Sequence, residues 1–97
     1  MSVRLVITTN ALPGKGAELA ALMHNHARNS RQEPGCEQFE IFQSVEDPDR
    51  LVILELWKDE AALAAHAELA KTRPPTGTQQ LRSDMGQRED YQYNRTR

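Results

Sequence analysis

The sequence contains a single cysteine, Cys36, and this scarcity limits its redox and metal chemistry. One cysteine cannot form a disulfide within the chain, and neither a CxxC pair nor a His-x-x-x-His pair is present. We therefore expect no bound metal. Cys36 is interpreted as a small, partly buried strand residue, with a nucleophile or sensor as the alternative.

Strong net charge and long apolar runs are also missing. The formal net charge of -2 gives no electrostatic reason to bind nucleic acid or an anionic membrane. No run approaches the ~20 apolar residues of a membrane span, and "MSVRLVITTN" lacks the pattern of a signal peptide. A Gly-rich phosphate loop is missing as well. We expect a cytoplasmic protein with no nucleic-acid or membrane partner and with no flavin, haem or metal cofactor.

Apolar residues are too few for a large core. With 97 residues the chain is expected to form one domain, 1–97, and only 38% of its residues are hydrophobic. Alternating apolar residues predict strands at 3–9, 36–44 and 51–57 and within 89–97. A helical repeat predicts a helix within 17–33, and Asp59 as N-cap of an alanine-rich segment predicts another at 60–71. Residues 78–90 have room for only a short helical turn, and the terminal "NRTR" is expected to be a solvated end.

This order of elements, β-α-β-β-α-β, is that of the α+β ferredoxin-like fold, an antiparallel four-stranded sheet with two helices on one face. Strand 51–57 is apolar on both faces, so something other than the helices must cover the second face. A second copy of the chain would do so, which predicts a homodimer. In strand 36–44, simple alternation places Phe39 and Ile41 on one face and Cys36 and Phe42 on the other.

The sequence resembles the antibiotic biosynthesis monooxygenase (ABM) domain family of dimeric α+β barrel proteins in two stretches, "EPGC" before a strand and "EDPDRLVILELWKDEAALAAH". The resemblance implies a homodimer whose two sheets form a barrel, with a cavity in each subunit between sheet and helices. It implies activities that include cofactor-free oxygenation of aromatic polyketides, isomerisation of a signal molecule and, in relatives, haem degradation. Family members often carry a second histidine shortly after the first, whereas "HAELAKTRPPTG" has none, which argues against haem ligation.

Two histidines are candidates for this cavity. His66 shares a helical face with small residues that should point at the sheet, so it is either a hydrogen-bonded core residue or, as the family pattern implies, a residue at the cavity. Its functional role would be a base or hydrogen-bond donor. His26 lies on the sheet-facing stripe of the first helix and is a candidate substrate-binding residue.

Three further residues complete the candidate site. Glu55 and Trp57 share one face of strand 51–57, and a carboxylate in that apolar company needs a partner or a raised pKa. Glu55 would orient the imidazole or the substrate, or else form a structural ion pair. Trp57 would form a wall of the cavity, or else serve only as a structural anchor. Tyr91 could hydrogen-bond a phenolic substrate, or could simply pack in the barrel.

The leading hypothesis is therefore a cofactor-independent monooxygenase acting on a small phenolic or enolic metabolite. Once deprotonated, such a substrate supplies electrons to O2 itself, so the protein needs a dry pocket and a base. An isomerase that uses the same histidine without oxygen is one alternative. A non-catalytic dimer that only binds a small-molecule ligand is the other.

Overall fold

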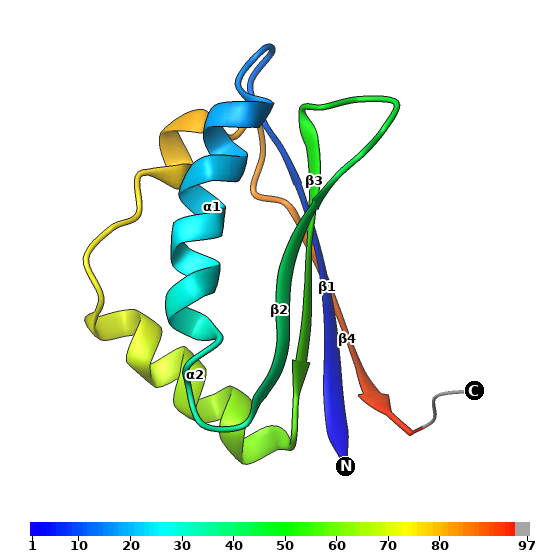
Figure 1. Ribbon diagram of the computed structural model, residues 1–97, viewed down its shortest axis with the longest axis vertical. Helices are drawn as coiled ribbons and strands as arrows, with labels where there is room; N and C mark the ends of the chain where they lie inside the picture. The colour runs from blue at the N-terminus through cyan, green and yellow to red at the C-terminus, as the bar shows by residue number, and fades with distance from the viewer. Residues whose placement is uncertain (95–97) are drawn as a thin grey trace.

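The computed structural model describes residues 1–94 and consists of one sheet with helices packed on one side (Figure 1). Most of the terminal "NRTR" lies outside the described residues. The elements are β1 (Ser2–Asn10), α1 (Gly16–Ser30), β2 (Cys36–Gln43), β3 (Arg50–Trp57), α2 (Glu60–Thr72), a 3-10 helix η1 (Thr78–Leu81) and β4 (Gln87–Tyr93). The predicted order of strands and helices is thus confirmed.

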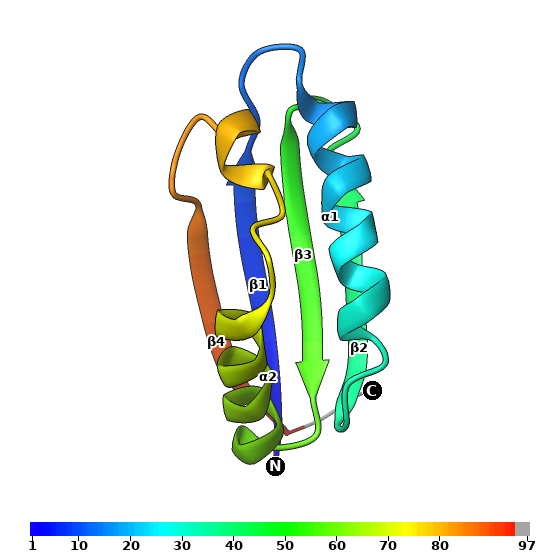
Figure 2. The same cartoon turned by 90° about the vertical axis from the view of Figure 1, so that its left-hand side faces the viewer.

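All strand pairs are antiparallel, and the strand order across the sheet is β2-β3-β1-β4. This is the ferredoxin-like order, in which β1 and β3 form the centre. Figure 2 shows α1 lying over β2 and β3, while α2 lies over the other half of the sheet. None of the helices within residues 1–94 is long and apolar enough to cross a membrane.

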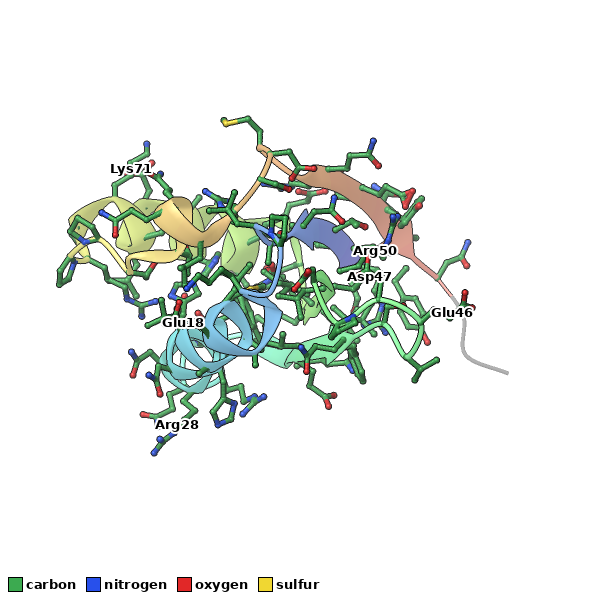
Figure 3. All side chains as sticks on the ribbon, turned by 90° about the horizontal axis from the view of Figure 1, so that it is seen from above. Glu18, Arg28, Glu46, Asp47, Arg50 and Lys71 are labelled. Carbon is green, nitrogen blue, oxygen red and sulfur yellow. The ribbon has the colours of Figure 1, made fainter. Side chains whose placement is uncertain are left out.

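The core lies between the helices and the inner face of the sheet. Val3 and Leu5 of β1 and Leu51 and Trp57 of β3 are buried there, as the period-2 pattern predicts. In α1, Leu19, Met23, Ala27 and Ser30 are buried on one face, as a helical repeat requires. Exposed charges such as Arg28 of α1 and Lys71 of α2 point outward in the view from above (Figure 3).

The prediction of the sheet face on which Cys36 lies is wrong. A β-bulge between Cys36 and Gln38 shifts the register, so that Cys36 lies opposite Trp57 and packs against the inner core. Phe42, beyond the bulge, stays on the outer face with 47% of its surface exposed. Simple alternation misassigned Cys36 because a bulge adds one residue to the strand and inverts the phase on one side of it.

Candidate active site

A cavity of about 510 Å³ lies between α2 and the inner face of the sheet, within the ~300–1,000 Å³ typical of small-molecule sites. Its walls are mostly aliphatic, with a few charged or polar groups. The lining residues are Leu5, Ile7, Glu55, Glu60, Leu63, Ala64, His66, Ala67, Ala70 and Arg88. The small residues that share a helical face with His66 were expected to point at the sheet, and two of them, Ala67 and Ala70, line this cavity while remaining exposed. Alanine is too short to reach the sheet there, which leaves the cavity open.

His66 stands on α2 at the wall of this cavity. The helix begins after Asp59, whose carboxylate accepts a hydrogen bond from the Ala62 N–H at 2.8 Å, as predicted for an N-cap. Two turns later, the imidazole packs on Trp57, with 4.6 Å between ring centroids and 34° between ring planes. The His66 side chain is 13% exposed and its Nδ1 lies 2.8 Å from Oε1 of Glu33. Within the described residues, Nε2 has no hydrogen-bond partner.

Glu33 is a site residue that sequence analysis missed. It lies just after α1, and its side chain is only 6% exposed. One carboxylate oxygen contacts His66, and the other lies 2.9 Å from Nη1 of Arg73, just beyond α2. The second contact is an ion pair without hydrogen-bond alignment, since neither atom has a directional partner among residues 1–94. An ionisable residue directly before a Pro-Gly turn was the available signal, but sequence analysis used it only to mark the helix end.

The turn after Glu33 explains why its carboxylate reaches α2. Gly35 adopts a left-handed conformation with φ of +83°, and its carbonyl accepts a hydrogen bond from the Lys58 N–H at 2.9 Å. A Cβ on Gly35 would lie only 2.5 Å from the Cβ of Ala62. The turn therefore packs directly against the first turn of α2, which brings Glu33 next to His66.

Glu55 and Trp57 form a buried pair on β3. The indole Nε1–H of Trp57 donates a hydrogen bond of 2.8 Å to Oε1 of Glu55, as their shared strand face allows. Glu55 is 3% exposed and lies across from Leu5 and Phe39 on the neighbouring strands. Burial raises the pKa of Glu55 above its ordinary value of 4.5, and the Trp57 N–H together with the charges of His66 and Arg88 only partly opposes this.

This raised pKa predicts a pH-dependent stability difference for Glu55→Gln. At pH values between the ordinary and the raised pKa, Glu55 is protonated in a larger fraction of folded molecules than of unfolded ones. The stability due to Glu55 is therefore largest at low pH and falls as pH rises. Glutamine stays neutral throughout. We therefore expect Glu55→Gln to gain unfolding free energy relative to wild type as pH rises above the ordinary pKa of a glutamate, as measured by urea unfolding at each pH. Glu68→Gln, on the exposed side of α2, is the control and should show a flat difference; a flat difference for Glu55→Gln would contradict the prediction.

The structure brings His26 close to this site but not Tyr91. His26 packs edge-on against Phe39, with 5.8 Å between centroids, and Phe39 also packs against His66 at 5.9 Å. Burial lowers the pKa of His26, as do the nearby charges of His66 and Arg73. His26 lines an adjoining hollow of about 320 Å³ under α1, which shares Ile7 with the larger cavity. Tyr91 lies on the outer face of β4, 51% exposed, and its hydroxyl donates to Glu89.

Among residues 1–94, no three His, Cys, Asp or Glu side chains are grouped so that they could hold a metal ion. The polar residues that line the cavity are instead Glu55, Glu60, His66 and Arg88, and Glu33 contacts His66 from outside the lining. This set offers one imidazole nitrogen with no hydrogen-bond partner among residues 1–94, near a buried carboxyl with a raised pKa. Such a set can accept and return a proton within an apolar pocket.

Comparisons with known proteins agree with this fold. The curated "Putative monooxygenase YcnE" of Bacillus subtilis is 38% identical over 58 residues, which span 60% of this chain and 61% of that relative. The match therefore spans less than two thirds of the relative's length. The crystal structure of PA3566 from Pseudomonas aeruginosa has a TM-score of 0.79 and 26% identity, covering 97% of this chain and 95% of that one.

A conserved protein from Methanosarcina mazei Go1 shares the fold, with a TM-score of 0.79 and 23% identity, over 97% of this chain and 94% of that one. The family model for antibiotic biosynthesis monooxygenases matches residues 2–73, which include both helices, the first three strands and all of Glu33, Glu55, Trp57 and His66. Since this match covers most of the 97 residues, the chain belongs to the antibiotic biosynthesis monooxygenase family.

Proposed function

We propose that this protein is a cofactor-independent monooxygenase that oxidises a small phenolic or enolic metabolite in the cavity beneath α2. The observation that carries the proposal is the placement of His66. Its ring lines the cavity, Nδ1 is held by Glu33, and Nε2 has no partner among the described residues. Membership of the family and the name of the Bacillus relative support an oxygenase over other proton-transfer enzymes.

The chemistry follows from one proton transfer at His66. Nε2 takes the hydroxyl proton of the substrate, and the resulting phenolate gives one electron to O2, producing an aryloxyl radical and superoxide. These combine at a ring carbon, and His66 returns its proton to the peroxide. Loss of water from the hydroperoxide leaves a quinone, so one oxygen atom enters the product and the other leaves in water. The aliphatic walls favour this route because they offer few groups that bind water beside the reacting anion.

Other residues at the cavity have supporting roles in this proposal. Trp57 is fully buried and lies outside the cavity lining, where it supports the imidazole from behind, and Glu55 lines the cavity together with His66. With its raised pKa, the carboxyl of Glu55 can be protonated and donate a hydrogen bond to a substrate oxygen. His26 borders the adjoining hollow and is proposed to contact the far end of the substrate.

Oxygen consumption tests this proposal. The protein is mixed with a panel of naphthols, naphthalenediols and hydroquinones, and O2 uptake is followed with an electrode while quinone is followed by its visible absorption. We expect one O2 per quinone and no release of O2 on adding catalase, because water rather than peroxide is the second product. Uptake that is unchanged by His66→Asn would reflect autoxidation of the substrate and would contradict the proposal.

Quenching of the fluorescence of Trp57, the single tryptophan of the chain, reports binding to the same cavity independently of turnover. A substrate that binds and is rearranged without O2 uptake would favour the isomerase instead. Binding with neither O2 uptake nor a new product across the panel would favour a ligand-binding protein. Either result would replace the monooxygenase proposal.

We also propose that the protein is a homodimer in which a second copy covers the outer face of the sheet. Both α1 and α2 lie on the other face (Figure 1), so neither helix covers the outer side chains of the sheet. Apolar residues are nevertheless concentrated there: Val6, Phe42, Val52, Leu54, Leu56 and Tyr91. Face-to-face pairing of such sheets can bury more than ~2,000 Å², enough for a stable dimer.

Leu54→Asp tests the dimer. Leu54 lies between Val6 of β1 and Glu40 of β2, near the middle of the outer face. A carboxylate buried there without a partner costs on the order of 3–5 kcal/mol, so we expect this variant to sediment as a monomer or to fail to fold at micromolar concentration. Val45→Asp, at a fully exposed loop position, should leave the dimer intact. A wild-type protein that sediments as a monomer, or a Leu54→Asp dimer as stable as wild type, would contradict the proposal.

A further inference from the structure

Two donor-bearing side chains meet the buried carboxylate of Glu33. His66 Nδ1 lies 2.8 Å from Oε1, and Arg73 Nη1 lies 2.9 Å from Oε2. The guanidinium is a permanent cation and can only donate, and an ionised carboxylate can only accept. The nitrogen of His66 that faces Oε1 must therefore carry a hydrogen. A neutral imidazole has one N–H, so this arrangement leaves the lone pair on Nε2.

We propose that Glu33 is a positioning residue that holds His66 as the Nδ1–H tautomer, with the Nε2 lone pair free for a ligand in the cavity. This inference rests on the function proposed above, since it makes His66 a base rather than a donor toward the substrate. The Arg73 guanidinium attracts the second carboxylate oxygen at 2.9 Å, which favours the orientation in which the first oxygen faces His66. The stacking of the ring on Trp57 prevents it from turning away from Glu33.

The three residues come from separate parts of the chain. Glu33 follows α1, His66 lies in the middle of α2, and Arg73 lies just beyond the end of α2. Through these two contacts the Glu33 carboxylate also connects the end of α1 to the middle of α2 and to the residue just beyond it. A purely structural role would explain both contacts equally well. A structural contact would also need Nδ1–H, so what separates the two roles is a folded variant in which the tautomer of His66 changes and the chemistry in the cavity either changes with it or does not.

Glu33→Gln separates them because an amide has one acceptor and one donor end. Arg73 cannot accept a hydrogen bond, so the amide oxygen must face Arg73 and the NH2 group must face Nδ1. His66 can accommodate this only by moving its hydrogen to Nε2. The substitution keeps the size of the side chain, and it should convert His66 from mainly Nδ1–H to mainly Nε2–H.

The experiment is NMR of the full-length protein labelled with 15N-histidine, in alkaline buffer where imidazoles are neutral. Protonated and unprotonated ring nitrogens differ widely in 15N shift, and comparison with His66→Asn assigns the His66 signals among the three histidines. We expect Nδ1–H in the wild type and Nε2–H in Glu33→Gln. Arg73→Met keeps the carboxylate and should keep Nδ1–H, as should the control Glu68→Gln on the exposed side of α2.

A wild-type His66 in the Nε2–H form would overturn the inference, even if Glu33→Gln does not fold. So would a folded Glu33→Gln variant that stays Nδ1–H. The NMR readout needs no substrate, so a failure of the proposed function leaves it intact: wild type would be Nδ1–H with no phenol oxidised. Where a phenol is oxidised, we expect Glu33→Gln to lower kcat by about 10²- to 10⁴-fold with little change in KM, because the base is then in the wrong tautomer.

Discussion

His66→Asn is expected to lower kcat for phenol oxidation by about 10²- to 10⁴-fold while leaving the protein folded, since a general base contributes that much to turnover. The asparagine amide N–H can take the place of Nδ1–H and donate to Glu33, so the buried carboxylate keeps a partner. No group replaces Nε2, however, and the substrate hydroxyl loses its proton acceptor. Initial rates of O2 uptake and thermal unfolding, compared with wild type, measure both effects.

His66→Ala is the matched variant for stability. It removes the partner of Glu33 as well as the base, and it leaves a space next to Trp57. We expect the same loss of activity as in His66→Asn but an additional loss of about 1–3 kcal/mol in unfolding free energy, because a buried acceptor loses its hydrogen bond. If His66→Asn were fully active per folded molecule, His66 would be a core residue, and the proposed base would have to be another group.

Local sequence was enough to predict most of the fold and one part of the site. The period-2 pattern of residues 51–57 places Glu55 and Trp57 on one face of β3, and the structure shows their side chains hydrogen-bonded. The N-cap at Asp59 sets the start of α2, which places His66 two turns later against the same indole. These relations hold because strand and helix periodicities fix which side chains share a face over short distances.

The contacts of Glu33 could not be predicted in this way. Glu33 and His66 are 33 residues apart, and their contact depends on how the end of α1 meets α2 across the sheet. That geometry is set by tertiary packing at the Gly35 turn and by the bulge beside Cys36, neither of which has a periodic signature. The side on which Tyr91 lies was equally undetermined, because β4 has polar residues on both faces and almost no apolar pattern.

Gly35→Ala is expected to be the most destabilising conservative change in the turn that carries Glu33. The left-handed φ of +83° costs a residue with a Cβ about 1–2 kcal/mol, and the new methyl would lie 2.5 Å from the Cβ of Ala62. Crowding of a packed contact adds about 1–3 kcal/mol. At about 4–8 °C per kcal/mol for a domain of this size, the melting temperature should fall by at least ~10 °C.

Gly14→Ala is the matched control, because Gly14 has nearly the same φ, +78°, but no atom within 4 Å of the added Cβ. It should lose only the conformational part, about 1–2 kcal/mol, when both variants are unfolded in urea at one protein concentration. Adding Ala62→Gly to Gly35→Ala removes the clashing methyl, so the double variant should be less destabilised than the sum of the two single changes. Equal losses for Gly14→Ala and Gly35→Ala would show that the turn does not press on α2. In that case, the position of Glu33 beside His66 would have to be maintained by its contacts with His66 and Arg73 alone.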